Sequence, residues 1–272
     1  MWKGFSREEL DRAYNNSLAV SNSAEIIAAW GTCSELARNE LKGRIDIPYG
    51  PGERQSYDLF PAGEGAPLVV FVHGGFWQNR SKNDFSFIAP NLVKAGISVA
   101  ILGYTLAPFA LIDQIVSDIR EGVRSIHDAA KKISPMHDNI WLIGWSAGAH
   151  LITMALDEPY VIGGTAISGI FDLEPIRHCY VNDKLKLTRE SAVQNSPIIL
   201  SNHFGKELDL FVGDAELPEM IKQTLDFSIY RNASVQKGGA SLLKGLNHYS
   251  ILDELVNPNG AIFSSIHDRV RS

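Results

Sequence analysis

Two kinds of apolar pattern alternate along most of the chain. Short and nearly continuous apolar runs are typical of strands that are buried on both faces of a sheet. Between these runs lie helical patterns, and the clearest one repeats apolar residues every three or four positions over residues 112–130. The runs that predict strands are residues 67–72, 97–102, 139–143, 164–168, 208–212 and 240–243.

This alternation predicts an α/β fold, in which a mostly parallel sheet is flanked by helices. Residues 44–49 and 56–60 bracket a turn that contains glycine and proline, so we expect a hairpin at the start of the sheet. Further helices are expected at residues 85–95 and 218–231. Ligands in such sheets bind at the carboxyl ends of the strands, where the functional residues are therefore expected.

Two segments depart from the alternation. Residues 1–40 are polar and helix-prone, with the best helical pattern at 23–30, and predict an N-terminal helical extension. Residues 171–199 mix charges, aromatic residues and short helical pieces, and we expect them to form a small cap over the ligand site. No repeat or Ser/Gly-rich linker interrupts the 272 residues, which favours a single domain.

Composition narrows the class of protein. The contents of 45% hydrophobic and 21% charged residues are ordinary for a soluble globular protein. The net charge of -6 argues against nucleic acid or an anionic membrane as a partner. Cys33 and Cys179 lie far apart, and no apolar run approaches the roughly 18 residues of a membrane span. The N-terminus lacks the apolar core of a signal peptide, so we expect a cytoplasmic protein. The sequence leaves the oligomeric state open, and a homodimer is one of the states it allows.

Residues 144–148, with the sequence GWSAG, are the strongest candidate for chemistry. They follow an apolar run and precede a helix of small residues, which is the context of a nucleophile elbow with Ser146 at its apex. The turn needs glycines because the strand and the helix pass very close to each other. A serine hydroxyl needs a histidine base that is itself held by a carboxylate.

In hydrolases with this elbow the chain order is serine, acid, histidine. After the run at 208–212 this order leaves His248 and His267 as candidates for the base, and His267 lies in an amphipathic tail where a solvent-facing role is expected. His248 follows the last expected strand and is our candidate. Glu216 is preferred as the acid because it stands three residues after Gly213, and Asp214 in the same loop stays an alternative.

Residues 73–77, with the sequence HGGFW, directly follow another expected strand. This is where the same fold supplies backbone N–H groups that stabilise an oxyanion, so we expect Gly75, Phe76 and Ala147 to donate them. His73 is expected to anchor this loop and His150 to be structural. The other histidines are expected on the surface or in packing roles: His127, His137, His178 and His203.

These residues resemble the kynurenine formamidases (arylformamidases) of the α/β-hydrolase fold. The resemblance spans most of residues 57–256 and includes HGGFW, the elbow GWSAGAH, the segment DLEPI at 172–176, and ELPEMIKQT at 216–224. It implies Glu216 as the acid and His248 as the base. The chain departs from the family pattern by having Glu216 where the best-known members have Asp, and Asn247 where they often have an acid.

The resemblance implies a serine hydrolase that cleaves a small acyl amide, such as N-formylkynurenine, through an acyl-serine intermediate. A general carboxylesterase is the alternative, and a non-catalytic binding module is a third hypothesis. No metal or organic cofactor is implied, since no H-E-x-x-H, C-x-x-C or nucleotide-binding glycine motif occurs. Aromatic residues expected to face the site and stack on an aryl group are Phe76, Trp77, Tyr104, Phe171, Tyr180 and Tyr249.

Overall fold

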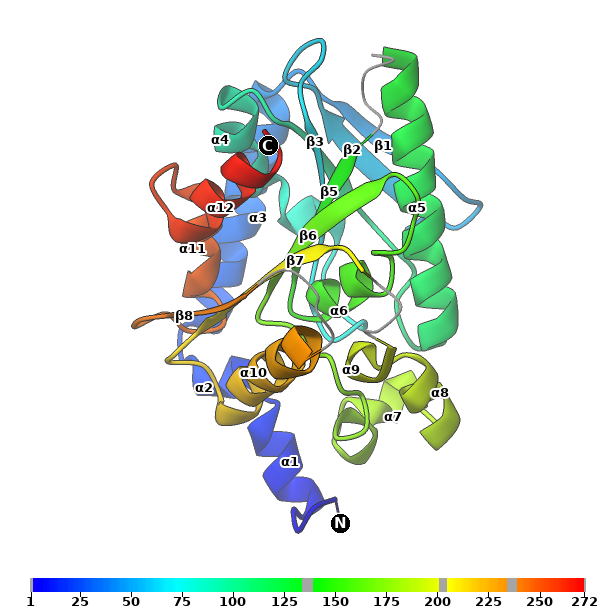
Figure 1. Cartoon of the computed structure of the whole chain (residues 1–272), viewed down its shortest axis with the longest axis vertical. Helices are drawn as coiled ribbons and strands as arrows, with labels where there is room; N and C mark the ends of the chain where they lie inside the picture. Colours follow the sequence, from blue (N-terminus) through cyan, green and yellow to red (C-terminus); the bar gives the residue numbers. More distant parts are fainter. Residues whose placement is uncertain (1, 134–138, 201–204, 234–238, 272) are drawn as a thin grey trace.

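An eight-stranded sheet forms the centre of the computed structural model, which describes residues 2–133, 139–200, 205–233 and 239–271. The strand order is β1-β2-β4-β3-β5-β6-β7-β8 (Figure 1). β1 and β2 form an antiparallel hairpin, β2 pairs antiparallel with β4, and the remaining neighbours are parallel. The strands are β1 Arg44–Pro48, β2 Ser56–Phe60, β3 Leu68–Val72, β4 Ser98–Leu102, β5 Ile140–Trp145, β6 Val161–Ile167, β7 Glu207–Gly213 and β8 Ala240–Leu243.

Helices cover both faces of the sheet and bury a separate apolar core on each (Figure 1). One face packs against α3, α4, α11 and α12, and the other against α5, α6 and α10. The strands β2 to β5 are buried along their whole length, as continuous apolar runs require. The covering helices are α3 Ser23–Glu40, α4 Ala89–Lys94, α5 Ile112–Ile133, α6 Ala147–Thr153, α10 Pro218–Ala233, α11 Asp253–Val256 and α12 Ala261–Arg269.

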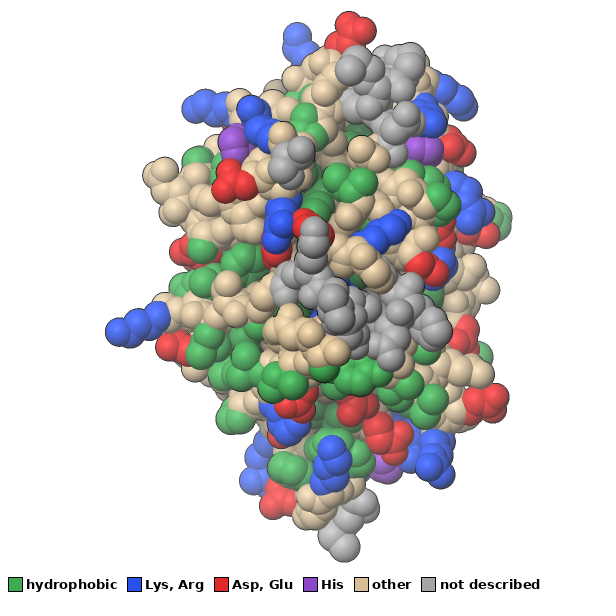
Figure 2. All heavy atoms as spheres, viewed as in Figure 1, with side chains coloured by type: hydrophobic (Ala, Val, Ile, Leu, Met, Phe, Trp, Pro, Cys, Tyr) green, Lys and Arg blue, Asp and Glu red, His purple; other side chains and the backbone are tan. Residues whose placement is uncertain are grey.

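The N-terminal helices α1 and α2 meet residues 171–199, the segment expected to form the cap and called the cap below, at one end of the molecule (Figure 1). The guanidinium of Arg7 binds the carboxylate of Asp183 at 2.6 Å, and the carboxylate of Asp11 accepts a hydrogen bond from the N–H of Tyr180 at 2.6 Å. Charged and hydrophobic side chains are intermingled on this end of the surface (Figure 2). The elements involved are α1 Arg7–Ala13, α2 Asn16–Ala19, η3 Ile176–His178, α7 Asn182–Leu185, α8 Arg189–Gln194 and α9 Pro197–Leu200.

The expected strands and the hairpin are present, and the helix expected at 85–95 differs. Two 3₁₀ turns, η1 Lys82–Asp84 and η2 Ser86–Ile88, come first, and the α-helix starts only at Ala89. Pro90 explains this start, because proline fits the first turn of a helix and not its interior. The helix expected at 23–30 continues to Glu40. The division into one domain with an N-terminal extension and a cap stays a prediction.

The register of the parallel strands aligns their carboxyl ends. Val72 is level with Gly144, Trp145 with Ile167, and Gly213 with Leu243. The loops after these strands therefore lie along one edge of the sheet, as expected for a ligand site. Among the helices that the structure describes, none has the length and apolarity needed to cross a membrane.

Candidate active site

Three buried side chains form a hydrogen-bonded chain at this edge. The Oγ of Ser146 lies 3.1 Å from Nε2 of His248, and Nδ1 of His248 lies 2.7 Å from Oε2 of Glu216. Their exposed fractions are 2%, 4% and 7%. Because a carboxylate can only accept, Nδ1 of His248 carries the proton in the neutral ring, and Nε2 is free to accept the proton of Ser146.

The carboxylate of Glu216 has further partners that fix its orientation. Its Oε1 accepts a hydrogen bond from Oγ of Ser168 at 2.5 Å and from the N–H of Gly213 at 2.9 Å. Asp214, the alternative acid, is exposed and accepts a hydrogen bond from the N–H of Gly245 at 2.6 Å. The structure therefore brings Glu216, and not Asp214, to the histidine.

Ser168 was not among the residues expected from the sequence. It stands directly after β6, at the same edge of the sheet as Ser146. A polar residue at the end of a buried parallel strand is the signal that points to it.

The elbow at Ser146 is built by the close approach of β5 and α6. Ser146 has a φ of 58°, in the left-handed region, which is uncommon for a residue other than glycine. A Cβ at Gly148 would lie 2.0 Å from the backbone oxygen of Val72, and a Cβ at Gly144 would lie 2.3 Å from the oxygen of Gly148. Only glycine fits at both positions, which explains the G-x-S-x-G pattern.

The loop after β3 packs against the elbow. A Cβ at Gly74 would lie 2.8 Å from Cβ of Ser146. Gly75, Phe76 and Trp77 have successive φ angles of 109°, 50° and 59°, all in the left-handed region. This unusual run turns the backbone sharply beside the hydroxyl of Ser146.

The three expected oxyanion donors have free N–H groups. Gly75, Phe76 and Ala147 donate no hydrogen bond to another residue that the structure describes. Ala147 opens α6, so its N–H has no partner within the helix. Ala147 is buried, and Gly75 and Phe76 are half-buried in the loop that packs against the elbow. N–H groups left free beside a candidate nucleophile are suited to bind a substrate oxygen.

His73 is buried and holds this loop in place through its ring. Its ring lies between those of Tyr104 and Phe85, with centroids at 4.4 Å and 5.7 Å, and burial lowers its pKa to about 3. The neutral ring donates from Nδ1 to the backbone oxygen of Gly74 at 2.8 Å. This is the anchoring position expected from the sequence.

His150 links three elements. Its Nδ1 accepts a hydrogen bond from Nε1 of Trp77 at 3.2 Å, and its Nε2 donates to the backbone oxygen of Asn195 at 2.7 Å. Burial lowers its pKa to about 4, so the ring is neutral and both nitrogens are used. The loop after β3, the helix α6 and the cap are thereby tied together.

The aromatic residues expected to line the site are mostly buried beneath it. Trp77, Tyr104 and Phe171 have no exposed surface. The hydroxyl of Tyr104 donates to the backbone oxygen of His73 at 2.9 Å, and Phe171 stacks on Phe227 at 4.2 Å. They support the site in this arrangement and have no surface on which an aryl group could stack.

Tyr249 lies at the edge of the site and is also buried, with 4% of its surface exposed. Its hydroxyl shares a hydrogen bond of 3.0 Å with Oγ of Ser17. Phe76 and Tyr180 are half-buried, and their rings meet edge to face at 6.3 Å. These two rings have the exposed surface that the other aromatic residues lack.

The remaining histidines lie away from this group. His127 stacks on Tyr160 at 4.2 Å, His178 contacts Glu174 at 3.0 Å, and the side chain of His267 is 37% exposed. His137 and His203 are outside the described residues. Within the described ranges, no cluster of three or more His, Cys, Asp or Glu residues could hold a metal ion.

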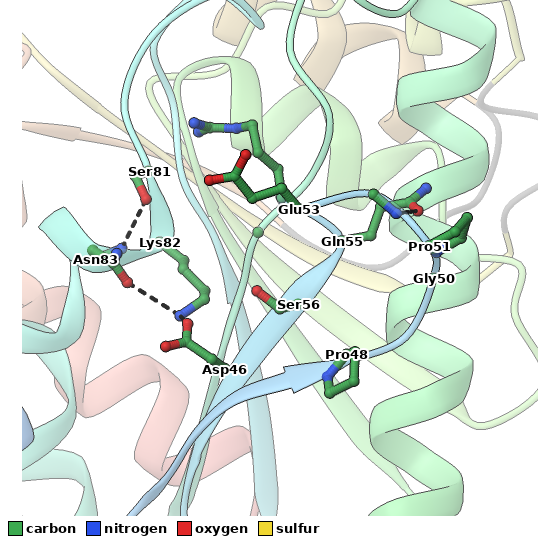
Figure 3. Close-up of a pocket in the computed structure, with 13 residues that line it drawn as sticks. Asp46, Pro48, Gly50, Pro51, Glu53, Gln55, Ser56, Ser81, Lys82 and Asn83 are labelled. Carbon is green, nitrogen blue, oxygen red and sulfur yellow. Dashed lines mark hydrogen bonds and ion pairs between the residues drawn. The ribbon is translucent and has the colours of Figure 1, made fainter.

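A separate cavity of about 620 Å³ lies beside the β1–β2 hairpin (Figure 3). Within it, Nζ of Lys82 binds the carboxylate of Asp46 at 2.6 Å, and the same ammonium reaches buried Asp58 at 2.5 Å. Neither Ser146 nor His248 lines this cavity.

Comparison with known proteins shows to which family the chain belongs. The family described as BD-FAE matches residues 59–158. The kynurenine formamidase of Danio rerio is 32% identical, with 95% of this chain and 94% of that protein covered. The chain belongs to the kynurenine formamidase family. The Drosophila melanogaster member is 27% identical over 76% of this chain and 75% of its own.

Solved structures extend this family relationship to the fold. A protein of Silicibacter sp. TM1040, provisionally named a thioesterase, superposes with a TM-score of 0.86 at 28% identity, covering 97% of this chain and 99% of its own. The Pyrobaculum calidifontis esterase superposes with a TM-score of 0.75 at 16% identity, covering 92% of each chain. The α/β-hydrolase fold expected from the sequence is confirmed, and this member of the kynurenine formamidase family is a hydrolase.

Proposed function

We propose that this chain hydrolyses N-formyl aryl amides of the N-formylkynurenine type through a formyl ester on Ser146. The observation that carries the proposal is the buried chain of hydrogen bonds from Ser146 through His248 to Glu216. Its kynurenine formamidase relatives cover nearly the whole chain and supply the substrate class. A buried nucleophile with little free surface favours a small acyl group, and formyl is the smallest.

Acylation begins when Nε2 of His248 takes the proton of the Ser146 hydroxyl. The Oγ attacks the formyl carbon, and the negative charge that forms on the carbonyl oxygen is stabilised by the N–H groups of Gly75, Phe76 and Ala147. Loss of one such donor typically slows turnover by about 10²-fold to 10³-fold. The charged imidazole then gives its proton to the nitrogen, the C–N bond breaks, and the arylamine leaves.

Deacylation repeats these steps with water. His248 takes a proton from a water molecule, whose oxygen attacks the formyl ester on Ser146. The C–O bond to Oγ breaks, Ser146 recovers its proton from the imidazole, and formic acid leaves and gives its remaining proton to water as formate. Glu216 holds the ring in one orientation and stabilises its charged form in both halves.

A carboxylesterase is the second candidate. The isoprenylcysteine methylesterase relatives from Arabidopsis thaliana are up to 36% identical, although the match covers only 42% of this chain. An ester carbonyl suits the same nucleophile and oxyanion donors. A non-catalytic binding module is disfavoured because all three groups of the proposed triad are present.

Parallel assays of N-formylkynurenine and p-nitrophenyl acetate test the proposal. We expect the higher kcat/KM for N-formylkynurenine, and Ser146→Ala should lower both activities by roughly 10⁶-fold. A fluorophosphonate should label the native chain and not Ser146→Ala. Ester hydrolysis without formamide hydrolysis would establish the carboxylesterase instead, and labelling that persists in Ser146→Ala would exclude Ser146 as the nucleophile.

The cellular location and the partners expected from the sequence remain predictions. The net charge of -6 supports a protein without a nucleic acid partner. On the face drawn in Figure 2, Lys and Arg side chains are scattered among Asp and Glu rather than gathered in one patch. The cytoplasmic location and the homodimer are predictions that cell fractionation and light scattering test.

A further inference from the structure

The junction between α1 and α2 is tied to the start of the cap. The hydroxyl of Tyr14 accepts a hydrogen bond from Nε2 of Gln223, on α10, at 3.1 Å. Oε1 of the same Gln223 side chain accepts hydrogen bonds from the N–H groups of Phe171 and Asp172, both at 2.8 Å. Tyr14 itself has no exposed surface and packs in the core that α5, α6 and α10 cover.

Three residues later, Ser17 on α2 contacts Tyr249, the neighbour of the base of the proposed triad. Oγ of Ser17 lies 3.0 Å from the hydroxyl of Tyr249, and the Tyr249 ring meets that of His248 edge to face at 5.7 Å. Asn16 is bonded to Ser17 in the chain, and their Cα atoms are therefore about 3.8 Å apart. Asn16 thus stands in the chain between Tyr14, which is bonded to Gln223, and Ser17, which is bonded to Tyr249 beside His248.

The carboxamide of Asn16 is buried without a partner. Only 3% of the residue is exposed, and neither Oδ1 nor Nδ2 makes a hydrogen bond to the rest of the described chain. Among the described residues with unpaired buried polar atoms, Asn16 is the one whose side chain has every polar atom unpaired. Such a group is costly to bury, and the residue needs a ligand that offers it both a donor and an acceptor.

We propose that the Asn16 carboxamide binds the leaving group of the substrate, at the polar end of an α-amino acid. This inference rests on the proposed function. His248 must protonate the departing nitrogen, so the leaving group lies on the His248 side, which is the side of Asn16. The scissile carbonyl is bound by the loop after β3 and is not available to Asn16.

An α-amino acid has the two complementary groups that Asn16 lacks. Its ammonium donates to Oδ1, and its carboxylate accepts from Nδ2. Hydrogen bonds to charged groups are stronger than those between neutral groups, so both charged ends of the ligand favour this contact. Asn16 is then a specificity residue for the amino-acid end of the leaving group, and it takes no part in bond breaking.

Two aryl formamides separate this role from a structural one. N-formylkynurenine carries the amino acid, and N-formyl-2-aminoacetophenone has the same formamide and ketone without it. In Asn16→Leu we expect kcat/KM for N-formylkynurenine to fall about 10-fold to 100-fold, and for the second substrate to change less than about twofold. The unfolding midpoint should not fall, because an apolar group of similar size replaces an unsatisfied amide.

Asn22→Leu is the matched control. Asn22 is exposed in the same N-terminal region and its side chain makes no capping hydrogen bond, so this substitution should leave both activities unchanged. An equal loss on both substrates in Asn16→Leu, together with a lower unfolding midpoint, would show that Asn16 is structural and overturn the inference. Unchanged activity on both substrates would also overturn it.

Measuring the binding of the product kynurenine tests the role of Asn16 independently of the proposed hydrolysis. Calorimetry should give a dissociation constant about 10-fold to 100-fold higher for Asn16→Leu than for the native chain. Equal constants would overturn the role of Asn16 even if the chain is a formamidase. A native chain that hydrolyses neither formamide would overturn the proposed function, and the inference with it.

Discussion

At the scale of single residues, the two carboxylates after β7 differ in what they contact. Glu216 meets His248 at 2.7 Å from within the site, whereas Asp214 is exposed and its carboxylate accepts a hydrogen bond from the backbone N–H of Gly245. In Glu216→Gln we expect kcat to fall by up to about 10⁴-fold, because a neutral amide cannot stabilise the charged imidazole. Steady-state kinetics on both substrate types measures this.

Asp214→Asn is the matched control for that prediction. An amide oxygen can still accept from the N–H of Gly245, so kcat should stay within about twofold of the native value, as for most surface substitutions. A large loss in Asp214→Asn with little change in Glu216→Gln would reverse the assignment of the acid.

The sequence predicts the residues of the proposed triad better than the residues that hold them in place. The elbow pattern and the chain order single out Ser146 and His248, but the spacing in the 214–216 loop leaves two carboxylates open. The deciding bonds come from Ser168 and Gly213, whose alignment depends on the sheet register. Asn16 has no local signal, because its burial depends on how the N-terminus folds over residues more than two hundred positions away.

At the scale of elements, the space around two helical glycines predicts opposite effects of alanine on the free energy of unfolding. Gly148→Ala would place a Cβ 2.0 Å from the backbone oxygen of Val72, so the helix must move. We expect a loss of about 3 kcal/mol or more in the free energy of unfolding. Gly31, inside α3, has open space around its Cβ position, and Gly31→Ala should gain about 0.5–1 kcal/mol.

Urea unfolding of both variants measures this pair of effects. A Gly148→Ala protein as stable as the native chain would mean that α6 does not lie as close to the end of β3 as the structure places it. Gly31→Ala controls for the general effect of alanine on helix propensity. Loss of stability in both variants would contradict the argument from local space.

Apolar runs predict strands well here because β3, β4 and β5 are buried on both faces, so nearly every position is apolar. The aromatic residues show where such patterns fail. Trp77, Tyr104 and Phe171 follow strands at the edge that carries the site, yet they point into the core. A residue's position after a strand predicts that it lies at the carboxyl edge of the sheet. Whether its ring points into the site or into the core depends on how the loops pack.

At the scale of the whole molecule, two apolar cores on opposite faces of the sheet are joined through the site. His150 packs in the face covered by α5 and α6, and its bonds reach Trp77 and the cap at Asn195. The ring of His248 contacts Trp145, which belongs to the core on the other face. Buried histidines therefore contribute both to the packing of the two cores and to the geometry of the site.

This dependence predicts how stability changes with pH. Burial lowers the pKa of His150 from 6.5 to about 4 and that of His73 to about 3, so below pH 6.5 the unfolded chain binds more protons than the folded one. Stability must then fall as the pH falls from 6.5 towards these values. Each histidine contributes a loss of about 2 kcal/mol between about pH 7 and about pH 5.

His150→Gln isolates one of these contributions. A glutamine can accept from Trp77 and donate to the oxygen of Asn195, but it does not bind a proton in this range. We expect its loss of unfolding free energy between about pH 7 and about pH 5 to be about 2 kcal/mol smaller than that of the native chain. Urea unfolding at both pH values measures the difference, and carboxylates that titrate in the same window cancel because both proteins contain them. Equal losses in the two proteins would mean that His150 titrates alike in the folded and unfolded chains, contrary to its burial between Trp77 and the cap.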